Sequence, residues 1–368
     1  MIKICLVTAN RAEYGILRDL IISIKKEKNF KLDVVVTGSH LDKKYGFTKN
    51  EILKDKIKIK KIINVYPKKD DSYEILNSIS KSLLGISIFL RKNNYNFLII
   101  LGDRYEIISP GLSAFFNKIP IIHFNGGDIT EGSLDNNIRD LITSISNLHL
   151  VSNKKSYERV KQIIGSNKNI FNIGSLSANR ILKQKILNKK ILEKILKINF
   201  NKYNYLITFH PITNKKNQTY KQFNSILDSM AKQKDCTIIF TYPNNDEDSE
   251  IIINLIKKFV NNNNNSYLYR SLGFENYISI CKNMTCVIGN SSSFILEIPF
   301  LNVPSINVGN RQKGRIIPKT VISVDANQKD ITKAIKIIKK KKIVNNKKTN
   351  IYLQPNNIKK IINLIKNY

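Results

Sequence analysis

The sequence predicts an α/β protein made of two doubly wound domains of parallel strands that face each other across a cleft. The chain has 368 residues, 42% of them hydrophobic, which exceeds one ordinary core and suits two domains of common size. Short apolar runs rich in β-branched residues alternate with longer amphipathic segments, as in parallel strands joined by crossover helices. Polar residues follow most of these runs, at the strand ends where open α/β sheets bind their ligands.

The first half of the chain contains one series of such elements. Strands are expected at residues 2–8, 32–38, 97–101, 119–124 and 148–152, and helices at 13–28, 72–92 and 105–117. Each strand run is short and rich in Ile, Leu and Val, which is typical of buried strands. The series ends with NIFNIGS at 169–175, so we assign residues 1–173 to an N-terminal domain.

A second series begins with a Lys-rich segment at 180–197, which we expect to form a connecting helix. Strands are expected at 205–209, 236–242, 285–289, 303–309 and 320–324, with helices between them. Residues 174–354 are therefore assigned to a C-terminal domain. In the last segment, 355–368, a proline precedes an amphipathic pattern that predicts a short helix.

The charge of the chain does not indicate a nucleic-acid partner. Sixty-one Lys and Arg against 28 Asp and Glu give a formal net charge of +33, but only ten of the cations are Arg and the lysines are scattered throughout. Basic recognition surfaces usually concentrate Arg with aromatic residues or along one helix face. We therefore expect no nucleic-acid binding, whereas an anionic small substrate suits the charge.

The composition also excludes other classes of protein. The four cysteines form no CxxC pair, so neither a zinc site nor a disulfide framework is expected. The N-terminal run MIKICLVTA is followed at once by polar residues and does not resemble a signal peptide. Because no run of 18 apolar residues occurs, we expect a cytoplasmic protein without membrane contact.

Two strand ends in the first half carry charged residues. The loop TANRAEYG at 8–15 opens a helix and places Arg11 where a phosphate could bind, although an ordinary turn with an exposed arginine is an equally good interpretation. This loop contains neither GxGxxG nor GKS, which disfavours dinucleotide binding and P-loop chemistry. In GDRYE, Asp103 directly follows an apolar strand, where its charge needs solvent, a ligand or a role as a helix cap.

The stretch HFNGGDITEGSLDNNIRD at 123–140 holds the densest group of polar residues. A histidine leaves a strand, two glycines permit close backbone approach, and Asp128, Glu131 and Asp135 follow within eight residues. Together with Asp103, these carboxylates can provide an acid and a base, because mutual repulsion makes their affinities for protons differ. Metal binding is the rival interpretation, but Asp-rich metal sites usually alternate more closely, so no metal is expected.

The second half carries residues suited to a nucleotide. TFHP places His210 just beyond a strand, where it could bind a phosphate or relay a proton. In GNSSSFILE, Ser291 and Ser292 lie at a helix N-terminus suited to a diphosphate, and Glu297 could accept two ribose hydroxyls. A structural histidine and plain serine capping are the alternatives.

The loop NVGNRQKGR at 307–315 adds Arg311 and Arg315 as possible phosphate contacts. Anion binders thus predominate in the C-terminal half and carboxylates in the N-terminal half. This distribution predicts a nucleotide on one wall of the cleft and the chemistry on the other.

Six motifs, in order along nearly the whole chain, resemble the hydrolysing UDP-N-acetylglucosamine 2-epimerases of sialic acid and related nonulosonic acid biosynthesis. The motifs are NRAEYG, VTGSHL, GDRYE, HFNGGDITEGSLDNNIRDLITSISNLHL, GNSSSFILE and NVGNRQKGR. Each string is weak alone, but their ordered set is specific. The resemblance implies two Rossmann-like domains of the GT-B type, with the C-terminal helix within 355–368 crossing back onto the N-terminal domain.

The resemblance also implies a reaction. UDP-GlcNAc and water give N-acetylmannosamine and UDP: a base removes the C2 proton, UDP leaves C1, and water adds to a 2-acetamidoglucal. This chemistry needs an acid and a base near C1 and C2 and cations or dipoles around the diphosphate, so no metal, NAD or PLP cofactor is expected. The resemblance further suggests a homodimer.

By position, the resemblance implies that Asp103, Asp128 and Asp135 are catalytic carboxylates, with Glu131 a nearby candidate. It implies contacts with UDP from six residues: Arg11, His210, Ser291, Ser292, Glu297 and Arg311.

The chain departs from the family pattern at several positions. Asp128 stands where the family usually has the Glu of HGGE, Phe294 where it has Gly, and Asp140 and Ser144 where it has His and Lys. Since a shorter carboxylate moves the reacting oxygen by about an ångström, a weakened or altered activity stays open. The alternatives are the same reaction on UDP-N,N'-diacetylbacillosamine, a GT-B glycosyltransferase that uses a UDP-sugar, and a non-catalytic UDP-sugar binder.

Overall fold

The chain divides into two compact units, each of which is built around its own parallel sheet. The computed structural model describes the following residues: 1–43, 46–65, 67, 71–130, 134–212, 218–244, 248–340 and 351–368. The first unit comprises Met1–Asp128, Leu134–Asn179 and Ile351–Tyr368, and the second comprises Ile129–Ser133 and Arg180–Asn350. The prediction of two doubly wound α/β domains is confirmed.

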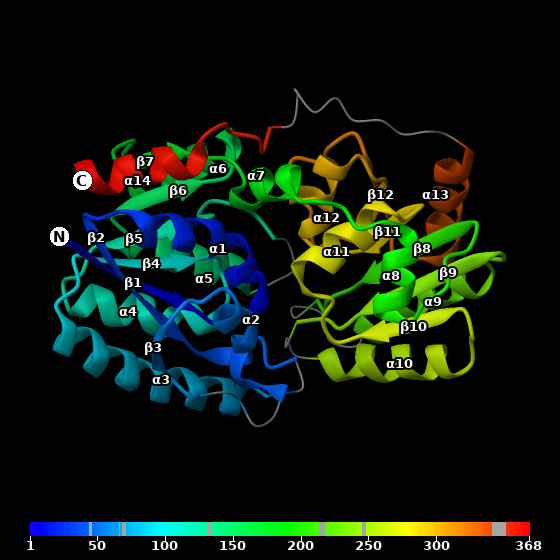
Figure 1. Ribbon diagram of the computed structural model, residues 1–368, viewed down its shortest axis with the longest axis horizontal. Coiled ribbons are helices and arrows are strands. Elements are labelled where there is room, and N and C mark those ends of the chain that lie inside the picture. Colours follow the sequence, from blue (N-terminus) through cyan, green and yellow to red (C-terminus); the bar gives the residue numbers. More distant parts are fainter. Residues whose placement is uncertain are drawn as a thin grey trace. The chain divides into compact units, whose positions relative to one another are not determined.

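The sheet of the first unit has seven parallel strands in the order β3-β2-β1-β4-β5-β6-β7 (Figure 1). Its strands are β1 (Ile2–Thr8), β2 (Phe30–Val36), β3 (Ile59–Ile62), β4 (Phe97–Leu101), β5 (Ile121–Phe124), β6 (Leu148–Val151) and β7 (Ile170–Asn172). The strand order reverses between β1 and β4. Ligands of open α/β sheets bind at such a switch point, beyond the carboxyl ends of the strands, where Arg11 and Asp103 follow β1 and β4.

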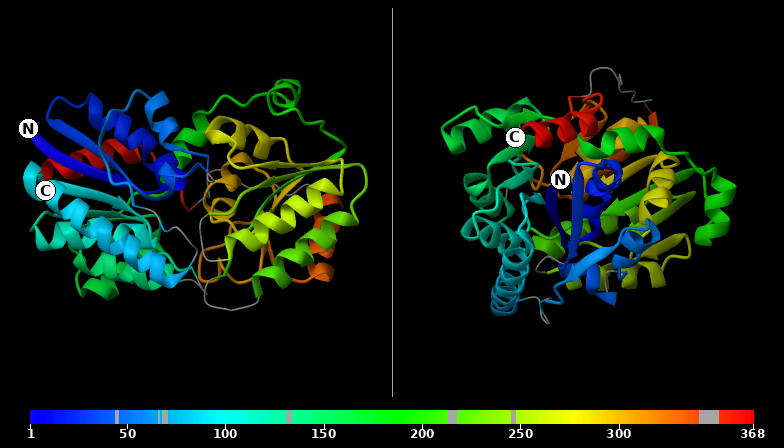
Figure 2. Two further views of the ribbon diagram at one scale, coloured as in Figure 1. Left: turned by 90° about the horizontal axis from the view of Figure 1, so that it is seen from below. Right: turned by 60° about the vertical axis from the view of Figure 1, so that its left-hand side comes forward.

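Helices cover both faces of this sheet (Figures 1 and 2). They are α1 (Arg11–Lys26), α2 (Lys49–Lys54), α3 (Ser72–Asn93), α4 (Ile108–Phe116), α5 (Asp135–Ile145), α6 (Lys154–Ile164) and α14 (Asn357–Asn367), with single 3₁₀ turns at Gly38–Leu41 and Tyr105–Ile107. One face packs against α1 and α14, and the other against α3, α4 and α5. The strands are therefore buried on both sides, which is why they are continuous apolar runs.

The sheet of the second unit has six parallel strands in the order β10-β9-β8-β11-β12-β13. These are β8 (Tyr203–Thr208), β9 (Cys236–Thr241), β10 (Ser266–Tyr269), β11 (Cys286–Gly289), β12 (Ser305–Val308) and β13 (Val321–Val324). The helices that follow them are α9 (Gln218–Ala231), α10 (Ser249–Asn261), α11 (Gly273–Lys282), α12 (Ser293–Leu296) and α13 (Gln328–Lys340), with a 3₁₀ turn at Ile298–Leu301. Here the order reverses between β8 and β11, after which His210 and Ser291 lie.

The prediction of a single helix at 180–197 is wrong. The structure has two helices there, α7 (Leu176–Lys183) and α8 (Lys189–Leu196). Asn188 starts the second helix, because its side chain accepts a hydrogen bond from the backbone N–H of Ile191. Just before it, the N–H of Leu187 donates to Ser279 Oγ at 3.1 Å, which holds the chain out of a helix.

The edge strands β3 and β10 were not expected from the sequence. The IKKI sequence of β3 is almost entirely exposed, and SYLY of β10 is mostly half-buried, so neither run has the apolar character of the central strands. Edge strands bury less side-chain surface, and their composition is correspondingly weaker evidence for a strand.

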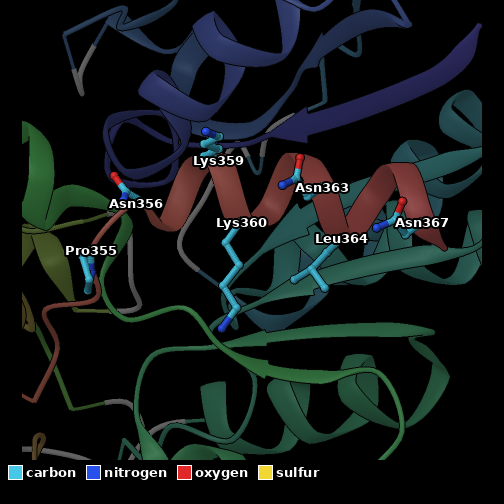
Figure 3. Close-up of a pocket in the computed structure, with 7 residues that line it drawn as sticks. All are labelled: Pro355, Asn356, Lys359, Lys360, Asn363, Leu364 and Asn367. Carbon is cyan, nitrogen blue, oxygen red and sulfur yellow. The ribbon is translucent and has the colours of Figure 1, made fainter.

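Helix α14 joins the hydrophobic core of the first unit. Ile361, Ile362 and Ile365 are buried against the face of the sheet that α1 covers, and α1 and α14 lie side by side (Figures 1 and 2). The opposite side of α14 borders a surface hollow of about 310 Å³ (Figure 3). None of the residues that line the hollow is a candidate catalytic or UDP-binding residue.

We expect Ile361→Ala to destabilise the first unit by about 2–5 kcal/mol, because Ile361 is fully buried and its truncation leaves a cavity. The measurement is urea denaturation followed by a probe in the first unit. Lys360→Ala, one residue earlier on the exposed side of α14, is the matched control and should change stability by less than about 0.5 kcal/mol. Equal midpoints for the two variants would show that α14 does not stabilise this unit.

Three buried histidines, His40, His123 and His149, belong to the first unit. Burial lowers the pKa of His40 to about 3 and the pKa of His123 and His149 to about 4. The charge of Arg11 adds to the effect at His40, and the charge of His123 adds to it at His149. All three are therefore neutral in the folded protein at pH 7 and down to the region of pH 5.

This burial predicts that acid destabilises the first unit. Below the ordinary histidine pKa near 6.5 these histidines are protonated in the unfolded chain but stay neutral in the folded unit. The free energy of unfolding therefore falls as pH drops from 6.5 towards 4. The loss is on the order of 2 kcal/mol at pH 5 for each of His123 and His149. The urea midpoint should fall between pH 7 and pH 5, because the three histidines together outweigh the opposite effect of buried Glu13, whose pKa is raised to about 8. A midpoint unchanged at pH 5 would contradict the prediction.

Candidate active site

A buried guanidinium links the ends of the two strands that carry the candidate carboxylates of the first unit. Arg139, on α5, is 1% exposed, and its Nη2 donates to Asp103 Oδ2 in an ion pair. Its Nη1 donates to the backbone carbonyl of Asp128 and, at 2.9 Å, to Asn136 Oδ1. Because an unpaired buried guanidinium is costly, this arrangement fixes Asp103 after β4 relative to Asp128 after β5.

Asp128 is buried, and hydroxyl groups contact its carboxylate. Ser152 Oγ and Ser156 Oγ donate to Asp128 Oδ1 at 2.8 and 2.6 Å. The turn before it needs left-handed backbone at Asn125 and Gly127, with φ of 61° and 75°, which explains the sequence NGGD. In the preceding strand, His123 Nε2 donates to the Gly102 carbonyl at 2.8 Å and so ties the end of β5 to the end of β4.

The other two candidate carboxylates differ in what the structure describes. Asp135 is the first residue of α5 and is half-buried, so its charge lies in the first turn, where the helix dipole stabilises an anion. Glu131 lies outside the described residues. The structure thus brings Asp103 and Asp128 together through Arg139, and it places Asp135 one turn before that arginine on the same helix.

The N-terminus of α1 contains an ionisable group, Glu13, that sequence reasoning missed. Arg11 is the first residue of α1, whose N-cap Asn10 accepts from the Glu13 N–H. Glu13 in turn accepts from the Ala9 N–H at 2.7 Å and from Asn10 Nδ2 at 2.6 Å. Burial, followed by the charge of Glu106, raises the pKa of Glu13 to about 8. The motif NRAEYG itself contains this glutamate.

In the second unit, Asn290 holds three strand ends together. Its Oδ1 accepts from the His210 N–H at 2.7 Å, and its Nδ2 donates to the His210 carbonyl at 2.8 Å. Its own carbonyl accepts from Arg311 Nη1 at 3.3 Å and from Gln312 Nε2 at 2.8 Å. Since Asn290 is fully buried, these bonds fix the loop of His210 and the loop of Arg311 beside the serine turn.

The same loops determine how His210 presents its ring. The Asn244 N–H donates to His210 Nδ1 at 3.1 Å, so Nδ1 is the acceptor and the proton of the neutral ring lies on Nε2. An Nε2–H is a donor suited to a phosphate oxygen. This agrees with the phosphate role expected for His210 but does not test it.

The serine turn GNSSS begins with a glycine that the fold requires. Gly289 has φ of 143°, and a Cβ there would lie 1.9 Å from the Thr208 carbonyl oxygen. Ser292 is the N-cap residue of α12 and Glu297 its C-cap residue, so the two lie at opposite ends of a single turn. Ser291 Oγ lies 3.1 Å from Ser293 Oγ, which in turn lies 2.8 Å from the Tyr277 hydroxyl.

Arg315 contacts the backbone of its own unit. Its Nε donates to the Ile129 carbonyl at 3.3 Å within the second unit. Gly314, beside it, packs against the side chain of Ile129 so closely that a Cβ would lie 2.8 Å away. Arg315 therefore supports this loop, and the phosphate contacts expected for Arg311 and Arg315 stay predictions.

In the part of the chain that the structure describes, no three His, Cys, Asp or Glu side chains gather in a way that could hold a metal ion. Over the same residues, no helix is both long and apolar enough to span a bilayer.

Comparison with known proteins identifies the family. Residues 22–366 match the family model described as UDP-N-acetylglucosamine 2-epimerase. A GDP/UDP-N,N'-diacetylbacillosamine 2-epimerase (hydrolyzing) of Campylobacter jejuni is 37% identical over 329 residues, which cover 89% of this chain and 85% of that protein. Polysialic acid biosynthesis protein P7 of Escherichia coli is 35% identical over 371 residues, which cover 100% of this chain and 94% of that protein.

Solved structures agree with this result at the level of the fold. The UDP-GlcNAc 2-epimerase of Neisseria meningitidis bound to UDP-GlcNAc has a TM-score of 0.82 at 18% identity, with complete coverage of both chains. The structure titled as a putative UDP-N-acetylglucosamine 2-epimerase of Listeria monocytogenes also has a TM-score of 0.82 at 18% identity, covering 99% of this chain and 96% of that one. The expected GT-B type of fold is confirmed, and the chain belongs to the UDP-N-acetylglucosamine 2-epimerase family.

Proposed function

We propose that this protein is a hydrolysing UDP-N-acetylglucosamine 2-epimerase, which converts UDP-GlcNAc and water to N-acetylmannosamine and UDP. The observation that carries the proposal is the pair of carboxylates, Asp103 and Asp128, held after neighbouring strands by Arg139. Inversion at C2 with loss of UDP from C1 needs an acid and a base next to each other. The hydrolysing relative of Campylobacter jejuni and the motif order of the sequence support the same reaction class.

The proposed reaction balances without a redox partner. A carboxylate takes the C2 proton, the electron pair forms the C1–C2 double bond, and the C1–O bond to UDP breaks. Water then adds to the 2-acetamidoglucal: its oxygen bonds to C1, and a proton is delivered to C2 on the opposite face. Every step is a proton transfer or a change of a C–O bond, so the side chains can supply the chemistry and no cofactor is proposed.

Asp103 and Asp128 have different neighbours, which supports different roles for the two carboxylates. Asp103 forms an ion pair with the buried cation of Arg139, and Asp128 accepts hydrogen bonds from the neutral hydroxyls of Ser152 and Ser156. We propose that Asp103 and Asp128 exchange protons with the sugar and that Asp135 and Glu131 assist them. Six residues are proposed to bind UDP: Arg11, His210, Ser291, Ser292, Glu297 and Arg311.

UDP-N,N'-diacetylbacillosamine is the second candidate substrate. The relatives of Campylobacter jejuni and Legionella pneumophila, 37% and 28% identical to this chain, carry that name. The bond changes at C1 and C2 are the same for both sugars, so the catalytic residues proposed above would serve either. A relative of Neisseria meningitidis named UDP-N-acetylglucosamine 2-epimerase, 27% identical to this chain, supports UDP-GlcNAc.

A second copy of the chain is the proposed partner, and an exposed apolar face of the first unit supports it. Tyr73, Leu76, Leu84 and Ile88 are 56–74% exposed along one side of α3, and Phe116 at the end of α4 is 77% exposed. These five side chains offer on the order of 500 Å² of accessible surface, against about 800 Å² that each partner of a stable dimer buries. An antiparallel pairing of α3 with its copy would set Tyr73 against Ile88 and Leu76 against Leu84.

A proton NMR time course in D₂O tests the reaction. With UDP-GlcNAc we expect free N-acetylmannosamine that carries deuterium at C2, together with one equivalent of UDP. Turnover of UDP-N,N'-diacetylbacillosamine alone would instead select the second substrate. UDP release that depends on an added acceptor would indicate a glycosyltransferase, and tight binding without any turnover would indicate a UDP-sugar binder. Either of the last two results would contradict the proposal.

The same assay tests the carboxylate assignment. Asp128→Asn keeps the size of the side chain but removes the proton acceptor, so turnover should fall by about 10³-fold or more while UDP binding is retained. The control is Asp19→Asn, which removes an equal charge from the surface of α1 and should keep the rate within about twofold. Normal turnover by Asp128→Asn would show that Asp128 is not a catalytic residue.

The apolar face predicts the oligomeric state. The wild-type chain should be a dimer in light scattering at micromolar concentration, and Leu84→Arg should make it monomeric, because two opposed arginines would enter a desolvated interface. Leu53→Arg, at a residue that is 51% exposed on α2, is the matched control and should leave the dimer intact. A wild-type monomer, or a dimer that survives Leu84→Arg, would refute this interface.

A further inference from the structure

The carboxylate of Asp128 is enclosed by a small network at the start of α6. Strand β6 ends at Val151 and α6 begins at Lys154, so Ser152 precedes the helix and Ser156 lies in its first turn. Both serines are 2% exposed, and both hydroxyls reach the same oxygen, Asp128 Oδ1, at 2.8 and 2.6 Å. Hydrogen bonds to a carboxylate are about twice as strong as neutral ones, so two of them fix the position of this oxygen.

Asn153 determines which way the two hydroxyl groups point. Its Nδ2 donates to Ser152 Oγ and to Ser156 Oγ, both at 2.9 Å. Its Oδ1 accepts from the Ser156 N–H at 3.0 Å, which settles the orientation of the amide. Since Asn153 Nδ2 can only donate to the two serine oxygens, each serine proton points at its acceptor, Asp128 Oδ1, and the network is directed towards that carboxylate.

The backbone before Asp128 approaches α6 so closely that only glycine fits. A Cβ on Gly127 would lie 2.3 Å from the Ser156 carbonyl oxygen and 2.9 Å from a methyl group of Val160. This approach places the Cα of Asp128 close enough to the two serines that a side chain with a single methylene group reaches both hydroxyls. A glutamate at 128 would carry its carboxylate about 1.5 Å further, so it would have to bend its side chain or move the backbone to keep both bonds.

We infer that Ser152 and Ser156 are positioning residues for catalysis, which hold the Asp128 carboxylate in its reacting position and match the site to aspartate at this place. The inference rests on the proposed function, because it assigns Asp128 a role in proton transfer. Asn153 completes the network by orienting the two hydroxyls, and Gly127 sets the distance over which they act. When a base is misplaced by about an ångström, the rate of proton transfer falls greatly while the affinity for the nucleotide is kept.

The first test removes the donors. Ser152→Ala and Ser156→Ala should each lower kcat by about 3- to 10-fold, and the double variant by about 10- to 100-fold, with KM and the Kd for UDP within about twofold. The matched control is Ser109→Ala: Ser109 is fully buried on α4, and its hydroxyl donates to the Ile79 carbonyl of α3 at 2.9 Å and not to a candidate residue. It should lose a similar amount of thermal stability and keep its kcat.

The second test is a double-mutant cycle with side-chain length. Asp128→Glu in the wild-type background should lower kcat at least 10-fold, because the longer side chain collides with its own donors. In the Ser152→Ala/Ser156→Ala background the factor by which Asp128→Glu lowers kcat should be at least fivefold smaller, since the serines no longer define the position of the carboxylate. A role of the serines in folding alone would give no such coupling. The single serine variants supply the same comparison if the double variant does not fold.

The outcomes separate this inference from the proposed function. If Asp128→Asn is inactive but the serine variants have the kcat of Ser109→Ala, or if Asp128→Glu costs the same in both backgrounds, the positioning role is refuted and the proposed function stands. If Asp128→Asn turns over normally, the proposed catalytic role of Asp128 fails, and the inference fails with it. A selective loss of kcat together with coupling to Asp128→Glu supports both.

Discussion

The buried guanidinium of Arg139 is the interaction on which the candidate catalytic half of the molecule depends. Two of its acceptors, the Asp103 carboxylate and the Asp128 carbonyl, come from the ends of adjacent strands. This cation gives two backbone turns that each end in an acidic residue a common partner. The charge of Arg139 therefore compensates the electrostatic cost of gathering carboxylates at one end of a sheet.

In the second unit a neutral side chain, Asn290, links the loops that follow neighbouring strands. Asn290 bonds both backbone atoms of His210 through its amide, and its carbonyl receives the side chains of Arg311 and Gln312. A neutral amide adds no charge to a region proposed to hold a diphosphate, so the cations there keep their full attraction for an anion. The two units thus use a cation where carboxylates gather and an amide where cations gather.

Much of the fold could be predicted because the central strands are buried on both faces. Their apolar runs place Asp103, His210 and Ser291 at strand ends with no knowledge of the tertiary structure. The exposed strand β3 and the interruption between α7 and α8 escaped prediction, because a polar edge strand has no apolar run and a cap at Asn188 is a weak local signal.

The candidate site was only partly predictable, for a different physical reason. Arg139 and Asn290 were in the quoted motifs, but their roles depend on which loops meet, and pairings over 36 and 80 residues leave no local pattern in the sequence. Ser152 and Ser156 resemble ordinary residues at the start of a helix, and only the close approach at Gly127 gives them Asp128 as a partner. The catalytic and UDP-binding roles themselves stay predictions.

The packing of α14 has a consequence for the order in which the protein is made. Ile361 and Ile365 belong to the core of the first unit, yet a ribosome adds them only after the entire second unit. The second unit is almost continuous in the chain and can complete its core during synthesis, whereas the first must wait with part of its α1-side core uncovered. The first unit is thus translated first but completes its core last. Until α14 packs, its uncovered apolar surface is one that a chaperone could bind.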